Sequence, residues 1–387
     1  MSPHSQGWPR WESENDGKNE KTTGKDRPPD MFFLGIDISK AKFDVALLTP
    51  ATDHKNSKPR SKSLPNSPVG FEQLQQWLRL NLVPIDQLHV ALEATGTYGQ
   101  ALARFLYERG CTVSVVNPAA IAAFAKSEMA RNKTDKADAI HIARYVQAFR
   151  PAAWVPPAPE VAHLQALARR RDALLQMRQM ETSRLESLES LESLESPPSQ
   201  GTVRTSIEAV IHLLNEQITA IEKEMRDHIK GTPSLKESHE LLDGIPGIAE
   251  ITANAILAEL PDIASFESAA AVAAFAGLSP SLKESGSSVR GRPHLSKIGS
   301  ARLRRALYFP AVAAMRHNPA VAALAERLRA RGKSKMAIIG AAMRKLLHLV
   351  YGVLKSRRPF DRGYHLTTAA TAAATAAAAA ASQLEAA

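Results

Sequence analysis

The stretch from residue 88 to 118, LHVALEATGTYGQALARFLYERGCTVSVVNP, constrains the fold of this chain more than any other segment. It begins with a short apolar run and a loop that contains glycine. It continues as an amphipathic helix and reaches a second apolar run after Gly110, which is positioned to end the helix. In a strand, helix and strand that follow one another in this order, the helix connects two parallel strands of one sheet. The stretch therefore predicts a βαβ unit.

The segments on either side extend this unit into a domain. MFFLGIDISKAKFDVALLT, from residue 31 to 49, predicts two short strands that form a hairpin. NKTDKADAIHIARYVQAF, from 132 to 149, predicts a helix with Asn132 or Thr134 as its cap. We expect a mixed α/β domain over residues 31–150.

The remainder of the chain is expected to be mostly helical. A Pro-rich boundary at 150–160 opens a linker and arm over 151–235, in which two long helical segments are expected to form an antiparallel helical arm that packs against another chain. The tandem repeat RLESLESLESLES lies within the first of them. Its leucines drift around the helix axis instead of forming a seam, so the repeat is interpreted as a low-complexity expansion.

A helical C-terminal domain is expected over 236–365. It contains LLDGIPGIAEITANAILAEL (241–260), which resembles a helix-hairpin-helix whose turn amides face a phosphate backbone. Polar residues 1–30 predict a disordered extension, and the Ala/Thr-rich residues 366–387 predict a low-complexity tail.

The positive charge of the chain is concentrated near its C-terminus. The formal net charge is +10, but residues 281–365 alone hold 19 Lys and Arg against 3 Asp and Glu, a local net charge of +16. Such asymmetry favours a polyanion, and nucleic acid is the default partner; the alternative is a solubilising surface. The first choices for phosphate contacts are Arg290, Arg292, Lys297, Arg302, Arg304 and Arg305. The last three of these are also placed to pack or cap a helix that starts near Ser300.

Composition also argues against several classes of protein. A single cysteine, Cys111, excludes an internal disulfide and a Cys-rich zinc site. No uninterrupted run approaches the ~18–20 apolar residues that cross a bilayer. The N-terminus lacks the apolar core of a signal peptide. We expect a cytoplasmic protein with no membrane partner.

Four carboxylates are candidates for a metal site. Asp135 and Asp138 stand three residues apart at the expected helix start, so they share one face and repel each other unless neighbouring lysines or a bound cation neutralise them. Asp37 and Glu93 each end an expected strand, where the ligand crevice of an α/β sheet is usually found. Oxygen donors without His or Cys suit Mg²⁺ or Mn²⁺, and a pair of such ions clamps a scissile phosphate. The plain alternative is solvated strand ends and a favourable first-turn charge.

A serine-rich basic loop is the second candidate site. Ser285, Ser287 and Ser288 lie between Glu284 and a run of basic residues. A positive field stabilises an attacking alkoxide and the transition state at phosphorus, so a serine here is a candidate nucleophile. The alternative is an ordinary flexible Ser/Gly loop.

These motifs together resemble one family. GIDISKAKFDVALL, ALEATGTY, VVNP, RNKTDKADA, IPGI, FAGLSPSLKESGSSVRGRPHLSKIG and LRRALY are similar, in the same order, to motifs of the DEDD transposases of insertion sequence family one-ten, over about residues 31–362. The resemblance implies an RNase H-like (RuvC-like) N-terminal domain, a coiled-coil arm and a C-terminal transposase domain.

The resemblance also implies roles for single residues and partners. Asp37, Glu93, Asp135 and Asp138 would hold the divalent metal. A serine, aligned with Ser285, would become attached to the cleaved DNA; Ser287 and Ser288 are the other candidates. A structured bridge RNA would pair with donor and target DNA, and the enzyme would act as a homo-oligomer.

The expected function is therefore cleavage and rejoining of DNA by a transposase that acts as a site-specific recombinase. Two other classes stay open. One is a Holliday-junction-type, metal-dependent nuclease that uses water as nucleophile. The other is a non-catalytic nucleic-acid-binding protein in which the acids are structural.

Overall fold

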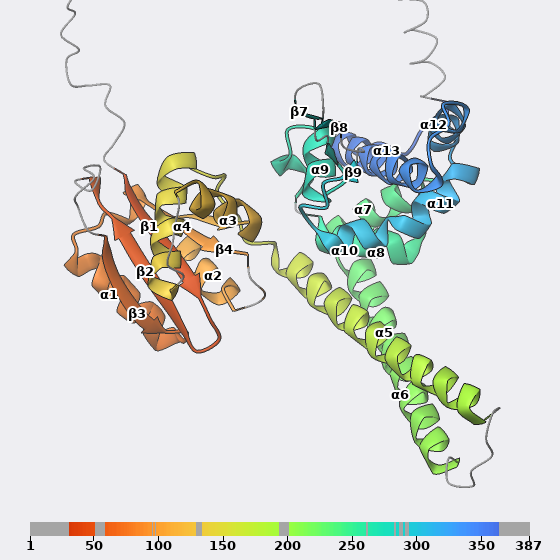
Figure 1. The fold of residues 1–387 in the computed structure, drawn as a ribbon, viewed down its shortest axis with the longest axis horizontal. Coiled ribbons are helices and arrows are strands. Elements are labelled where there is room, and N and C mark those ends of the chain that lie inside the picture. Colours follow the sequence, from red (N-terminus) through yellow and green to blue (C-terminus); the bar gives the residue numbers. More distant parts are fainter. Residues whose placement is uncertain are drawn as a thin grey trace, which may run out of the picture. The chain divides into compact units, whose positions relative to one another are not determined.

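The computed structural model divides the chain into two compact units, Met1–Val155 and Pro156–Ala387, each described here by itself (Figure 1). The residues described are 31–50, 59–94, 96, 98–128, 134–192, 201–260, 262–281, 284–285, 289–290 and 294–363. The predicted extension at 1–30 and the predicted tail at 366–387 lie outside these residues. The finer division into five parts stays a prediction.

The first unit is a mixed sheet covered by helices. Its elements in chain order are β1 (Phe32–Ile38), β2 (Lys42–Leu48), β3 (Arg60–Pro65), α1 (Pro68–Leu80), the 3₁₀ turn η2 (Ile85–Gln87), β4 (Leu88–Glu93), α2 (Gln100–Glu108), β5 (Thr112–Val116), α3 (Pro118–Ser127) and α4 (Asp135–Phe149).

The five strands follow the order β3-β2-β1-β4-β5. β1 and β2 are antiparallel, as are β2 and β3, whereas β1, β4 and β5 run parallel. The predicted hairpin, the βαβ unit β4-α2-β5 and the α/β class are therefore confirmed. The order is consistent with an RNase H-like domain. β3 was not predicted, because RSKSLP buries only Leu64 and lacks an apolar alternation.

Helices cover both faces of this sheet, so the unit has three layers. α1 and α2 pack on the face that carries Leu34 and Ile36 of β1, and α3 and α4 pack on the opposite face. In Figure 1, α4 lies across β1 and β2. Gly35 allows the close approach of α4, because a Cβ at this position would lie 2.1 Å from the Ala139 carbonyl oxygen and 2.2 Å from the Ala143 nitrogen.

Both ends of α4 have identifiable causes. The Thr134 hydroxyl accepts a hydrogen bond from the Ala137 amide at 3.2 Å, so Thr134 is the cap; the alternative, Asn132, lies outside the described residues. The helix ends where the backbone of Arg150 adopts the left-handed conformation, with φ 43°. The following segment then lies along the sheet edge, since the Trp154 amide donates to the Val113 carbonyl of β5 at 2.6 Å.

The second unit is helical except for two small strand pairs. Its elements in chain order are α5 (Pro159–Glu192), α6 (Gly201–Gly231), α7 (Pro233–Asp243), α8 (Glu250–Glu259), the 3₁₀ turn η3 (Ile263–Ser265), α9 (Ala269–Phe275), β6 (Pro280–Ser281), β7 (Glu284–Ser285), β8 (Val289–Arg290), β9 (His294–Leu295), α10 (Ala301–Ala306), α11 (Tyr308–His317), α12 (Pro319–Ala330) and α13 (Lys335–Ser356). The mostly helical C-terminus is as expected.

α5 and α6 pair as an antiparallel arm, the two long helices that lie side by side in Figure 1. Arg171 of α5 bonds Glu222 of α6 at 2.7 Å, while Arg204, near the start of α6, pairs with Glu189, near the end of α5. A small apolar core, which includes Leu174, fills the space between the helices. Knobs-into-holes packing of a coiled coil is not established by these contacts.

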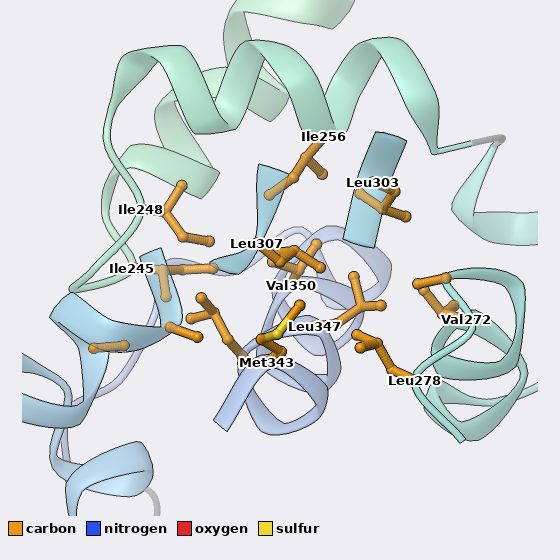
Figure 2. Packing of buried hydrophobic residues seen from close by; sticks show 14 of the residues in the cluster. Ile245, Ile248, Ile256, Val272, Leu278, Leu303, Leu307, Met343, Leu347 and Val350 are labelled. Carbon is orange, nitrogen blue, oxygen red and sulfur yellow. The ribbon is translucent and has the colours of Figure 1, made fainter. Parts of the chain in front are cut away.

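A single apolar core unites the remaining helices around α13. Figure 2 shows Met343, Leu347 and Val350 of α13 facing Leu303 and Leu307, and all five side chains are buried. α13 is also the one described helix that is long and apolar enough to cross a membrane. Arg344 and Lys345 interrupt its apolar residues, so it is not an uninterrupted apolar run. Because 56 % of its most apolar stretch is buried, its burial is that of a core helix.

The segment predicted to resemble a helix-hairpin-helix forms α7, a tight turn and α8. Gly247 has φ 101°, and a Cβ there would lie 2.7 Å from the Ala314 Cβ, so glycine fits both the backbone and the close contact. The buried Asn318 side chain donates to the Pro246 carbonyl at 3.2 Å and ties the turn to the core. The turn's contact with phosphate stays a prediction.

Candidate active site

Strand register gathers three carboxylates on the face of the sheet that α4 covers. Side chains alternate along a strand, so Asp37, two residues after Gly35, faces α4 as Gly35 does. Asp44 of β2 is the register partner of Asp37. Glu93 follows Ala91 by two residues on β4, and Ala91 belongs to the core beneath α4. The three acids therefore lie at one end of the same face.

The first turn of α4 brings two more carboxylates to this end. Asp135 and Asp138 both belong to that turn, which Thr134 caps. Carboxylates are favourable there, because the unpaired amides of a helix N-terminus carry partial positive charge. Contact of Gly35 with Ala139 and Ala143 holds the start of the helix over β1.

The acids act on one another electrostatically. Burial first, and then the charges of Asp138, Asp135, Glu93 and Asp44, raise the pKa of Asp37 from 3.8 to about 6. The structure thus brings all four predicted acids, Asp37, Glu93, Asp135 and Asp138, into one neighbourhood, which we call the acidic end. Their catalytic role stays a prediction.

Lys42 and Asp44 are two further residues of the acidic end that sequence reasoning missed. The Lys42 ammonium lies 2.9 Å from Asp135 Oδ2 and 3.1 Å from Asp44 Oδ2. Asp44 is only 3 % exposed. The hydrogen bond from Lys42 lowers the pKa of Asp135, and the same bond raises the pKa of Lys42. The available signal was a lone aspartate inside the otherwise apolar strand KFDVALL.

This contact bears on how the two aspartates of α4 tolerate each other. Sequence reasoning left open whether neighbouring lysines or a bound cation neutralise them. In the structure a lysine does so for Asp135, but it is Lys42, 93 residues earlier in the chain. Local sequence had no means of pairing these two residues.

The donor set fits a hard divalent cation in its chemistry, because every candidate ligand is a carboxylate. Within the described part of the chain, however, no three His, Cys, Asp or Glu side chains are arranged so that they already surround an ion. A metal at the acidic end would therefore draw the carboxylates inward and compete with Lys42 for Asp135.

The predicted serine belongs to the second unit. Glu284 and Ser285 form β7, which pairs antiparallel with β8, and Ser285 is the register partner of Val289. Ser287 and Ser288, the other candidates, lie outside the described residues. One short strand therefore lies on each side of residues 286–288, and the role of Ser285 stays a prediction.

The predicted phosphate contacts differ in what already holds them. Arg304 donates to the Ala276 carbonyl at 2.9 Å, and Arg302 lies 3.8 Å from Glu259, so these two have structural partners. Lys297 and Arg305 are exposed. Arg290 belongs to β8, and Arg292 lies outside the described residues. The alternative of a packing role therefore fits Arg304 better than Arg305.

A second basic segment joins α12 to α13 and was not among the first choices. Five exposed cations stand at alternate positions of this segment, which we call the basic turn: Arg327, Arg329, Arg331, Lys333 and Lys335. No acid lies between Arg327 and Lys335, and none of the five cations forms an ion pair within the described part of the chain. The spacing of two in RLRARGKSK was the available signal.

The mixed sheet and the acidic end are consistent with one class of protein, the DEDD transposases, and comparison with known families assigns the chain to this class. Residues 34–190 match the DEDD transposase model of IS110, and residues 239–326 match the model described as transposase IS116/IS110/IS902 family.

Individual relatives extend the match to most of the chain. The pilin gene-inverting protein of Moraxella bovis is 34% identical over 334 residues, which cover 86% of this chain and 98% of the relative. The transposase for insertion sequence element IS1328 of Yersinia enterocolitica is 27% identical over 300 residues, covering 72% and 82%. An insertion element IS110 protein of Streptomyces coelicolor is 32% identical over 161 residues, covering 41% and 38%.

The chain belongs to the IS110 family of transposases, and it is a DNA transposase/recombinase. The family match was expected from the motifs. Transposases of the DEDD type are in general divalent-metal dependent, and their substrate is DNA.

Proposed function

We propose that this chain moves its own insertion sequence by cutting and rejoining DNA, with Asp37, Glu93, Asp135 and Asp138 as ligands of Mg²⁺ or Mn²⁺ and Ser285 as nucleophile. One observation carries the proposal. The four acids come from three elements far apart in sequence and lie at one end of one sheet face, where burial, and then the charges of the neighbouring acids, raise the pKa of Asp37 to about 6. Carboxylates gathered in this way repel one another, and a bound divalent cation would relieve that repulsion.

A bound divalent ion would supply charge neutralisation at the scissile phosphate and lower the pKa of an oxygen nucleophile. The protein's own contribution is to hold the ligands. Asp37 and Glu93 are fixed by strand register, and Asp135 and Asp138 by the capped first turn of α4. Sites on such regular elements keep their geometry better than sites on loops.

The serine step is a transesterification. The Ser285 hydroxyl loses its proton, its Oγ forms a bond to phosphorus, and the bond from phosphorus to the departing DNA oxygen breaks. That oxygen takes up a proton. The phosphoserine link conserves the phosphodiester bond energy, so the reverse reaction with a new DNA hydroxyl reseals the strand without a further cofactor.

Two features support rejoining over simple hydrolysis by a water-using nuclease. The relative from Moraxella bovis, which this chain matches over 98% of its length, is named for inverting a pilin gene. Inversion requires that cut ends be joined again. The serine run also lies in the segment with the highest positive charge, which suits an attacking alkoxide. The non-catalytic alternative leaves the acidic end unexplained, because carboxylates repel a DNA backbone.

We further propose that the basic residues of the second unit bind nucleic-acid phosphates. Arg290, Arg292, Lys297 and Arg305 remain candidates, and the basic turn adds five more cations. In our proposal the partners are donor and target DNA together with a bridge RNA. Sequence specificity then comes mainly from base pairing, while the protein reads backbone shape and charge. The reaction takes place in the cytoplasm.

The arm and the turn between α7 and α8 complete the proposal. We propose that α5 and α6 join subunits as a coiled coil, because an exposed apolar residue such as Leu213 (54 %) lies on a helix that already has an internal partner. The turn at Gly247 would present amides to a phosphate, as in a helix-hairpin-helix. A homo-oligomer then supplies acids and serine to the same DNA.

Trapping the covalent intermediate tests the core of the proposal. Purified protein with its element's DNA, RNA and Mn²⁺ is expected to give an adduct that survives denaturing electrophoresis, with the DNA fragment on Ser285 by mass spectrometry. Ser285→Ala and Asp135→Asn are each expected to bind nucleic acid and form no adduct. An active protein without any adduct would contradict the serine and favour the nuclease. An adduct on Ser287 or Ser288 would move the site within the same loop.

A further inference from the structure

The Lys42 ammonium lies among the carboxylates of the acidic end. It bridges Asp135, a proposed metal ligand on α4, and Asp44 on β2, at 2.9 and 3.1 Å. These distances are those of charge-assisted hydrogen bonds. Lys42 thereby links the first turn of α4 to the sheet, although the two segments are distant in sequence.

Asp44 anchors the lysine. Its side chain is 4 % exposed, whereas the side chain of Lys42 is 48 % exposed and that of Asp135 is 59 % exposed. A buried carboxylate needs a partner to remain charged, and the structure provides Lys42. Because Asp44 is also the register partner of Asp37, it fixes the ammonium beside the proposed metal ligands.

We propose that Lys42, anchored by Asp44, is a tethered cation that neutralises the acidic end before metal binds and gives up Asp135 when the metal enters. The inference rests on the proposed function, which makes Asp135 a metal ligand. Lys42 and Asp44 are positioning residues: neither coordinates the ion, but together they set how tightly it binds.

The physical reason is competition for one oxygen. Asp135 Oδ2 accepts the hydrogen bond from Lys42 and would have to turn toward a metal to coordinate it. An ammonium that stayed within a few ångströms of a divalent ion would repel it. Removing the ammonium should therefore strengthen metal binding, while it leaves the metal-free carboxylates with their repulsion unrelieved.

Calorimetric titration of the full chain with Mn²⁺ tests this competition. Lys42→Met keeps the length of the side chain and removes its charge. We expect about tenfold tighter Mn²⁺ binding, which corresponds to ~1.4 kcal/mol of binding free energy. We also expect a lower melting temperature in EDTA. Lys42→Arg retains the charge and should stay close to the parent in both measurements.

Lys40 is the matched control. It lies in the turn between β1 and β2, two residues before Lys42, is exposed, and forms no ion pair within the described part of the chain. Lys40→Met removes the same charge at nearly the same place. Its Mn²⁺ affinity should change much less than that of Lys42→Met, because the effect depends on contact with Asp135 and not on net charge.

Asp44→Asn tests the anchor through a double-mutant cycle on Mn²⁺ affinity. With Asp44 neutral, Lys42 is held less firmly, so Lys42→Met should gain less affinity in this background than in the parent. Equal gains in both backgrounds would remove Asp44 from the inference.

The outcomes separate the two levels of the argument. A parent that binds Mn²⁺, with Lys42→Met binding it equally or more weakly, overturns the tethered cation and leaves the metal site standing. A parent that binds no Mn²⁺, or binds it unchanged after Asp135→Asn, overturns the metal site itself and the inference with it.

Discussion

The acidic end of the first unit and the basic turn of the second unit carry opposite charges and are built in opposite ways. The acids are fixed by strand register, by the Thr134 cap and by the contact of Gly35 with α4. The basic turn needs no such fixing, since its cations stand exposed where one helix ends and the next begins. A metal centre requires positions, whereas a phosphate backbone requires only charge within reach.

The largest expected effect is a loss of activity on changing the acidic end. Asp138→Asn removes one proposed metal ligand with almost no change in shape, so strand-transfer activity should fall by at least about a hundredfold. Melting in EDTA should be unchanged or slightly higher, because one source of repulsion is gone. The control is Asp86→Asn in η2, an exposed aspartate of the same unit, which should leave activity intact. Equal activity of both variants would sink the assignment of Asp138.

The next effect tests the claim that the acidic end depends on position. Gly35→Ala would drive a methyl group into the backbone of α4, 2.1 Å from the Ala139 carbonyl oxygen. We expect a loss of roughly 3 kcal/mol in the free energy of unfolding, at the upper end for overpacking, as measured by denaturant titration.

Gly352 in α13 provides the opposite case for the same substitution. A Cβ at Gly352 meets nothing within 4 Å. Gly352→Ala should therefore stabilise the chain by about 0.5–1 kcal/mol through helix propensity alone. If the two substitutions changed stability by the same amount, the close contact of Gly35 with α4 would not be a determinant of the fold.

The basic turn should respond by increments. Arg329→Gln, Arg331→Gln and Lys333→Gln should each lower the slope of log affinity against log salt by about one, and the triple variant should lower it by about three, without abolishing binding. Fluorescence anisotropy with the element's DNA and RNA measures this slope. Arg184→Gln, whose arginine already pairs with Glu181 on the arm, is the control and should not alter it. An unchanged slope in the triple variant would exclude the basic turn from the interface.

The smallest effect concerns pH. Because the pKa of Asp37 is about 6 in the folded chain against 3.8 ordinarily, the folded state binds more protons at Asp37 between these values, and stability from this group falls as pH rises through that window. Asp37→Asn should therefore melt higher than the parent at pH 7.5 in EDTA, and the difference should shrink toward pH 4.

The lowered pKa of Asp135 acts in a different window. Its contribution is present above the ordinary carboxyl pKa and is lost only as pH falls below it, so it does not mask the effect of Asp37. A difference between Asp37→Asn and the parent that stayed constant from pH 4 to pH 8 would contradict the proximity of the acids.

Within the first unit, the sequence predicted some elements and contacts and not others. It found β1, β2, the unit β4-α2-β5 and the helix α4, because apolar periodicity and glycine stops are local signals. It missed β3 and the pairing of Lys42 with Asp135, because a polar edge strand has weak periodicity and a contact across 93 residues has no local signature. Strand-end position pointed to Asp37 and Glu93, whereas the role of Asp44 depends on which strand lies beside β1.

The two outer strands of the sheet have a consequence for how copies of this chain meet. On the β5 side, the Trp154 amide already donates to Val113, and on the β3 side Arg60 and Lys62 expose charged side chains. Such edges resist the strand-to-strand stacking that makes β proteins aggregate. If several copies meet on one DNA molecule, as we propose, these edges would keep their sheets from fusing into a continuous ribbon, and helices would mediate the self-association.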